Sequence, residues 1–281
     1  MSEEDHDNHH DNSSPYNDNA SPHHDHAATA DIHNAPTMKS VSCLCPTFAR
    51  TGLLEEAIES FLRQDYEGDS ELLVLNDFEG HTLHYQHPRV RVLNTPRYPT
   101  LGEKRNALAA LAQGELLLTW GDDDIHLPHR ISRMVSALGD DSMCMEGWHF
   151  CSYHAGEIAL NKFATAGAHI ITRDAYDKAG GIKPLSVGED VAFNDSVRGL
   201  IGPVPVATEN PAFFYRWSDT GRHHISGYGT DREGKPSAYA RMLDYANALV
   251  LKGTERAGEV SLTPRWRSDY TAACAAAVSR T

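Results

Sequence analysis

The 281-residue sequence lacks a long hydrophobic run and contains only five cysteines. A membrane-spanning helix needs about 20 consecutive apolar residues, so the sequence predicts no such helix. Its N-terminus is polar throughout, which argues against a secretory signal peptide. Cys43 and Cys45 are two residues apart in an apolar run and are poorly placed to bond each other. We therefore expect reduced thiols and a cytoplasmic protein.

Basic residues are missing from the first 36 positions, which carry eight of the 39 acids. The remaining 31 acids and 25 bases give the body a net charge of −6. A mildly acidic body without a basic stripe argues against a nucleic-acid partner. Residues 1–37 are rich in Asp, His and Asn, and we expect a disordered tail. Its seven histidines could bind metal, but the composition favours a solvated segment.

Alternating strand and helix patterns begin at about Lys39. Because they alternate, we expect an α/β fold with a Rossmann-like, mainly parallel sheet flanked by helices. Thr51 is a plausible N-cap for the first helix. The second half is less regular, with a helix that opens on acids at 188–200 and a strand that enters a glycine-rich loop at 211–229. Residues 166–182 are expected to form a strand, a short helix and a glycine turn. The other expected strands are 39–48, 70–77, 89–95, 115–124 and 142–153, and the other expected helices are 51–66, 101–114, 125–138, 236–251 and 265–279.

Polar residues follow three of these strands, namely Pro46-Thr47, Asn76-Asp77 and Asp122 to Asp124. Ligands of such sheets bind beyond the carboxyl ends of the strands, so we expect these side chains to meet at one edge. The three aspartates alone allow two interpretations. They could hold a hard divalent cation, Mg²⁺ or Mn²⁺. They could instead cap the helix predicted over 125–138.

Other residues favour the metal interpretation. Arg105 lies near the start of the helix at 101–114, where an anion can be held. Glu189 and Asp190 supply a further acid pair, and His223 and His224 lie in the glycine-rich loop. A cation, an anionic ligand and a carboxylate base can all be assigned to these residues.

The ordered set of motifs resembles the nucleotide-sugar half of family 2 glycosyltransferases. The resemblance rests on a strand ending in Pro-Thr-aromatic, a Ser-x-x-x-Gln helix at 60–64, a strand ending in Asp77, an Arg-Asn helix and an Asp-x-Asp motif at 122–124. It covers residues 40–130 well and continues more weakly to about 229. Ala49 stands where the family usually has Asn, and the sequence after Asp77 departs from the usual pattern.

The resemblance implies a GT-A fold with three parts. Residues 38–130 would form the nucleotide-sugar half of a glycosyltransferase domain over 38–236, and residues 131–236 a divergent acceptor half. Residues 237–281 would form C-terminal helices packed on the domain.

The resemblance also implies a donor site. Asp77 would bind the nucleobase, with Pro46, Thr47 and Arg50 lining that pocket. Asp122 would contact the ribose or donor sugar, and Asp123 would point away and brace its neighbours.

Further roles follow from the same resemblance. Asp124 would bind Mn²⁺ or Mg²⁺, with His224 as a late ligand and His223 as its substitute. Arg105 would lie near the diphosphate or help to hold Asp77. Asp190 would be the catalytic base, which Glu189 orients.

The implied function is an inverting, metal-dependent transfer of a sugar from a nucleotide-sugar, expected to be UDP-linked, to a hydroxyl acceptor by single displacement. The acceptor could be a saccharide or lipid-linked. Trp148 and Trp217 could stack on it, and Arg265 to Arg267 in the last helix could touch the inner membrane face. The residues leave open an inactive nucleotide-sugar-binding module and a modified nucleic-acid base as acceptor. A sugar nucleotidyltransferase would need a glycine-rich loop, but residues 45–52 hold one glycine.

Overall fold

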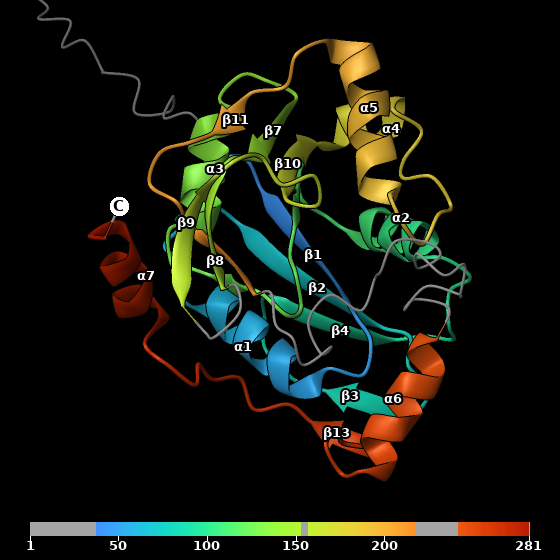
Figure 1. Cartoon of the computed structure of the whole chain (residues 1–281). Coiled ribbons are helices and arrows are strands. Elements are labelled where there is room, and N and C mark those ends of the chain that lie inside the picture. Colours follow the sequence, from blue (N-terminus) through green and yellow to red (C-terminus); the bar gives the residue numbers. More distant parts are fainter. Residues whose placement is uncertain (1–37, 153–156, 217–240, 281) are drawn as a thin grey trace, which may run out of the picture. The chain divides into compact units, whose positions relative to one another are not determined.

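The structure is a computed structural model that describes residues 38–152, 157–216 and 241–280 (Figure 1). Residues 37–281 form one compact unit, so the C-terminal residues belong to the same unit as the rest of the body. The acidic tail lies outside the described residues, and its disorder stays a prediction.

The central sheet confirms the predicted α/β fold. Among the described residues it comprises β1 (Val41–Thr47), β2 (Ser70–Asn76), β4 (Val90–Asn94), β5 (Leu116–Thr119), β7 (Met143–Glu146), β10 (His169–Thr172) and β11 (Val206–Ala207). Their order is β11-β7-β10-β5-β1-β2-β4. All neighbours pair in parallel except β10, which is antiparallel to β5 and β7.

Helices cover both faces of this sheet (Figure 1). On one face lie α1 (Thr51–Leu62) and α3 (Arg130–Leu138), and on the other α2 (Leu101–Leu111), α4 (Arg173–Lys178) and α5 (Glu189–Ile201). Successive strand residues point to opposite faces. In β2, Leu72 and Val74 therefore join the cluster under α1, while Leu73 and Leu75 join the cluster under α2. A strand buried on both faces needs the continuous apolar run that this sequence shows.

Two smaller sheets complete the unit. One has the order β6-β12-β8-β9 and the other pairs β13 with β3 in parallel. Helix α7 packs against β9, and α6 packs through Met242 and Ala246 on Phe48 and Phe78. The bounds of these elements are β3 (His81–His84), β6 (Ile125–His126), β8 (Trp148–Ser152), β9 (Ile158–Lys162), β12 (Phe213–Arg216), α6 (Met242–Leu251), β13 (Gly258–Ser261) and α7 (Tyr270–Val278).

Several predicted elements were wrong at their boundaries because long-range pairing overrides local pattern. The single strand expected over 142–153 is divided at Gly147 into β7 and β8, which belong to different sheets. The helix expected from 125 begins only at Arg130, because Ile125 and His126 pair with β12. The residue before α1 is Arg50, and the Thr51 hydroxyl binds Glu255 instead of capping the helix.

The last helix was also predicted too long. It begins at Tyr270, so Arg265 to Arg267 lie in a segment that is neither helix nor strand. The Trp266 indole N–H donates to the Ser60 hydroxyl at 2.9 Å, and the Arg63 guanidinium lies over its ring. Trp266 therefore packs on α1 and is not presented to a membrane from a helix.

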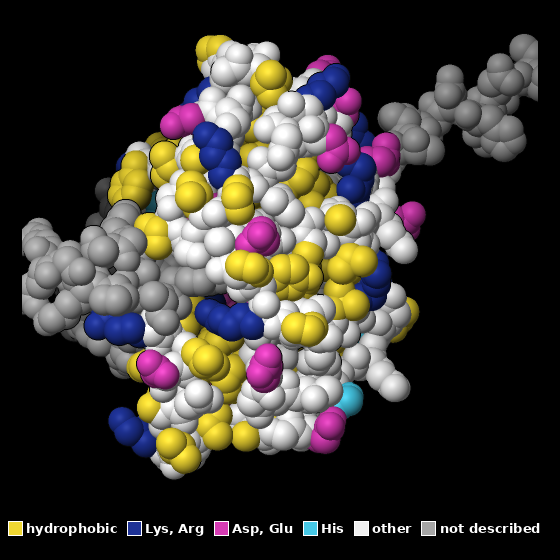
Figure 2. Space-filling model, turned by 90° about the vertical axis from the view of Figure 1, so that its right-hand side faces the viewer, with side chains coloured by type: hydrophobic (Ala, Val, Ile, Leu, Met, Phe, Trp, Pro, Cys, Tyr) yellow, Lys and Arg dark blue, Asp and Glu magenta, His cyan; other side chains and the backbone are white. Residues whose placement is uncertain are grey.

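The cysteines, the surface charges and the helix lengths bear on three expectations from the sequence. All five cysteines are buried and unbonded. On the face seen in Figure 2, Lys and Arg side chains are dispersed among acidic, hydrophobic and other residues. Across the described ranges, every helix is too short or too polar to span a bilayer.

Candidate functional site

A cavity of about 370 Å³ lies beyond the carboxyl ends of β1, β2 and β5. The three polar strand ends meet there, as predicted. Ten of the residues that sequence reasoning assigned to the site line it: Pro46, Thr47, Arg50, Asp77, Arg105, Asp122, Asp123, Asp124, Glu189 and Asp190. Topology explains this convergence, because parallel strands direct their carboxyl ends to one edge and α5 opens onto the same edge.

Of the other four predicted residues, only one is described, and it does not line this cavity. Trp217, His223 and His224 lie outside the described residues. Trp148 begins β8 away from the cavity wall, with the Lys162 ammonium 4.8 Å from the centre of its ring. Tyr215 of β12 does line the cavity and presents an aromatic side chain there.

Asp77 is held by a buried lysine that sequence reasoning missed. The Lys104 ammonium donates to Asp77 Oδ1 and, at 2.6 Å, to the carbonyl of Thr47. The backbone N–H of Tyr98 donates to Asp77 Oδ2 at 3.1 Å. Burial lowers the pKa of Lys104 and the Asp77 carboxylate opposes that shift. The only local signal is the position of Lys104 beside Arg105 in the first turns of α2.

Arg50 compensates the adjacent negative charges of Asp122 and Asp123. Its guanidinium forms a fork with both oxygens of Asp122, and Nη1 donates to Asp123 Oδ2 at 2.6 Å. Such bidentate pairs are strong and directional. Burial raises the pKa of Asp122, while Arg50 opposes the rise. Asp123 lines the cavity and so does not point away from it as predicted, and its bracing role stays a prediction.

Asp124 carries the least compensated charge of the three. Its Oδ1 accepts a hydrogen bond from the backbone N–H of Arg216 at 3.0 Å. Burial and the neighbouring Asp123 raise its pKa well above the usual range. The capping interpretation is wrong, because α3 begins at Arg130 and its N-cap, His129, has no side-chain capping bond.

The carboxylate oxygens at this edge suit a hard cation. A divalent ion beside Asp124 would lower the cost of its buried charge, and oxygen ligands are those that Mg²⁺ and Mn²⁺ take. In the part of the chain that the structure describes, no three His, Cys, Asp or Glu side chains are grouped so that they could hold a metal ion.

The second acid pair occupies the first turn of α5. Asp190 is half-buried, and its Oδ1 accepts a hydrogen bond from the N–H of Val191 at 2.8 Å. Glu189 is buried, 3.5 Å from Arg105 Nη2. Burial raises the pKa of Glu189 and Arg105 opposes the rise. Arg105 thus holds Glu189, and its alternative role of holding Asp77 belongs to Lys104.

Two further cavity residues escaped sequence reasoning. Burial, with Arg105 nearby, lowers the pKa of His169 to about 4, so its imidazole is neutral at neutral pH. Met242 reaches the cavity from α6, far along the chain from the other lining residues. Neither residue belongs to a recognisable motif, since each arrives through tertiary packing.

Comparison with known proteins identifies the family to which a chain with this fold and this acid-lined cavity belongs. Residues 42–186 match the family described as glycosyl transferase family 2, and the chain belongs to this family. Search of the curated proteins gives no match.

Solved structures of Staphylococcus aureus TarS share the fold. The structure of TarS 1-349 has a TM-score of 0.51 at 15% identity, covering 63% of this chain and 60% of that one. The complex with UDP has a TM-score of 0.52 at 14% identity, covering 67% and 62%. The complex with UDP-GlcNAc has a TM-score of 0.55 at 16% identity, covering 74% and 66%. This chain therefore spans about 60% of the first of these relatives.

Proposed function

We propose that the protein is an inverting, metal-dependent glycosyltransferase that moves a sugar from a UDP-sugar to a hydroxyl acceptor. The observation that carries the proposal is the convergence of Asp77, Asp122 to Asp124 and Asp190 on one cavity. Family membership supports it, as do the UDP and UDP-GlcNAc complexes of TarS, which shares the fold.

In the proposed donor complex, the nucleobase lies against Asp77, Pro46 and Thr47. Lys104 holds the Asp77 carboxylate in place and leaves lone pairs free to accept from the base. Asp122, oriented by Arg50, contacts the ribose or the sugar. A preorganised acceptor set of this kind lowers the cost of binding a polar ligand.

Asp124 would hold Mn²⁺ or Mg²⁺, with His224 as a second ligand from outside the described residues. When bound, the cation stabilises the negative charge that builds on the leaving diphosphate. Arg50 would hold Asp122 and Asp123 oriented beside it.

Asp190 would accept the proton of the attacking hydroxyl. That oxygen forms a bond to the anomeric carbon as the bond to the diphosphate breaks, so a single displacement inverts this centre. General-base catalysis of this kind contributes about 10²–10⁴-fold to the rate. Glu189, held by Arg105, would keep the first turn of α5 in position.

The acceptor would be a saccharide, a lipid-linked sugar or another hydroxyl compound. Tyr215 lies in the cavity wall and provides a surface on which a sugar ring can stack. The acceptor contact predicted for Trp148 would require a substrate that extends beyond this cavity.

The proposal is tested by incubating the protein with common UDP-sugars and Mn²⁺ and measuring UDP release. We expect release that EDTA abolishes and that Mn²⁺ or Mg²⁺ restores. UDP binding by calorimetry without turnover on any acceptor would instead indicate an inactive binding module. Absence of both binding and release would contradict the proposal.

A further inference from the structure

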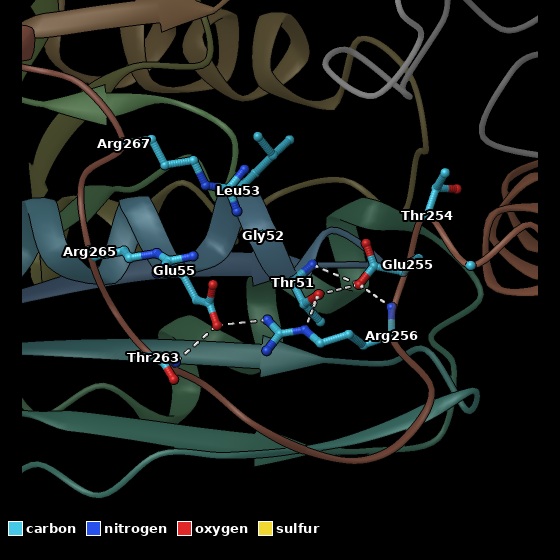
Figure 3. Close-up of a pocket in the computed structure, with 11 residues that line it drawn as sticks. Thr51, Gly52, Leu53, Glu55, Thr254, Glu255, Arg256, Thr263, Arg265 and Arg267 are labelled. Atoms are coloured by element: carbon cyan, nitrogen blue, oxygen red, sulfur yellow. Dashed lines mark hydrogen bonds and ion pairs between the residues drawn. The ribbon is translucent and has the colours of Figure 1, made fainter.

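A second pocket of about 420 Å³ lies where the segment after α6 crosses the beginning of α1. It is lined by Thr51, Gly52, Leu53 and Glu55 of α1 and by residues between Gly253 and Arg267 (Figure 3). Its volume falls within the range of about 300–1,000 Å³ that is usual for small-molecule sites. The donor-site residue Arg50 immediately precedes it in the chain but lines the other cavity.

The acids of this pocket are already compensated. Glu55 Oε1 accepts from Arg256 Nη2 at 2.8 Å and from the N–H of Thr263 at 2.9 Å. Glu255 accepts from the N–H and hydroxyl of Thr51 and from the N–H of Arg256. Both carboxylates are buried, and Figure 3 shows these bonds running along the pocket wall.

Two arginines of the pocket remain uncompensated. Arg265 and Arg267 are exposed, and within the described residues neither guanidinium has a hydrogen-bond or ion-pair partner. Figure 3 shows both side chains reaching from the C-terminal segment toward α1. Arg267 Nη2 lies 2.7 Å from the position that a Gly52 Cβ would occupy, so the glycine makes room for the guanidinium.

We propose that this pocket binds a small phosphate ester, independently of the donor site. Guanidinium groups bind phosphate oxygens bidentately and with strong, charge-assisted hydrogen bonds. Two unpartnered guanidinium groups on one pocket supply the donors, and the volume leaves space for an organic group beside the phosphate. The inference goes beyond the proposed transferase activity and does not depend on it.

Calorimetric titration with glycerol 3-phosphate, in the presence of saturating UDP, tests the proposal. We expect the protein to bind, and the double variant R265Q/R267Q to bind about 100-fold more weakly, about tenfold for each arginine. The control K178Q/R280Q removes two exposed charges elsewhere and should bind like the unmodified protein. No binding by the unmodified protein, loss of binding on adding UDP, or equal binding by R265Q/R267Q would overturn the proposal.

A parallel titration with inorganic phosphate separates the two sources of the anion. Equal affinity would assign the site to the free ion and overturn the ester, whereas weaker binding supports the ester. Gly52→Ala provides a variant that should not unfold the protein, because Gly52 lies in a helix with an ordinary φ and alanine is a better helix former. It should displace Arg267 and weaken binding without lowering the Tm, and unchanged binding counts against the site.

UDP release should be the same in R265Q/R267Q and in the unmodified protein. If neither protein releases UDP but glycerol 3-phosphate still binds, the proposed transferase fails and the phosphate site stands.

Discussion

Residues 38–190 and the C-terminal segment, residues 241–280, reach the same cavity in different ways. In residues 38–190, the acids that line the cavity come after a strand or open a helix, so local sequence and sheet topology place them. In the C-terminal segment, Met242 lines the cavity only because α6 packs on Phe48 and Phe78. Part of the cavity wall therefore lies outside residues 42–186, which carry the family match. The acids of a site and the residues that enclose it can therefore come from different parts of the chain.

The largest effect should come from Asp190→Asn, which tests whether the chemistry belongs to the motif residues. We expect UDP release to fall by about 10²–10⁴-fold, because the amide cannot accept the hydroxyl proton. UDP binding, measured by calorimetry, should persist. Asp195→Asn, an exposed change on the same helix, should leave the rate unchanged, and an active Asp190→Asn enzyme would place the base elsewhere.

Lys104→Met should give the largest loss of stability, since it leaves the buried Asp77 carboxylate without its ammonium partner. We expect the free energy of unfolding to fall by about 3–5 kcal/mol in urea titrations. The double variant D77N/K104M should recover part of that loss, because it removes the buried charge. A change below about 1 kcal/mol in Lys104→Met would show that water replaces the ammonium.

Acid should lower the free energy of unfolding, because His169 is buried in its neutral form. The folded-state pKa of His169, about 4, lies below the ordinary value of 6.5, so the unfolded chain binds the proton more readily. Its contribution, up to about 3 kcal/mol, is present above pH 6.5 and is lost as the pH falls toward 4. Urea titrations at several pH values should show this slope. If His169→Asn retains the full slope, another buried histidine is responsible.

Met242→Ala should have the smallest effect and tests whether the C-terminal segment takes part in donor binding. Met242 is buried and also lines the cavity. Removal of its side chain should lower the free energy of unfolding by about 2 kcal/mol, the lower end of the usual range for a buried methionine. We expect a raised KM for the UDP-sugar with kcat unchanged. Leu251→Ala, on the exposed end of the same helix, is the control. An unchanged KM in Met242→Ala would confine α6 to a structural role.

The fold and most of the candidate site could be predicted because their signals are local. The apolar run of β2 and the acids after β2 and β5 are enough to indicate a parallel sheet with one polar edge. Lys104 could not be predicted in the same way, since its neighbour Arg105 has the same charge and only the packing of α2 decides which one meets Asp77. The division of residues 142–153 at Gly147 depends on β11 and β12, which come much later in the chain.

The parallel pairing of β13 with β3 has a consequence for how the protein is made. It joins residues 258–261 to residues 81–84, and contacts so distant in sequence form slowly because a long loop must close first. On the ribosome, residues 38–190 emerge well before the segment that carries Met242 and β13. We expect the nascent chain to acquire the acids of the cavity early and the complete cavity wall only after residues 241–261 have been made.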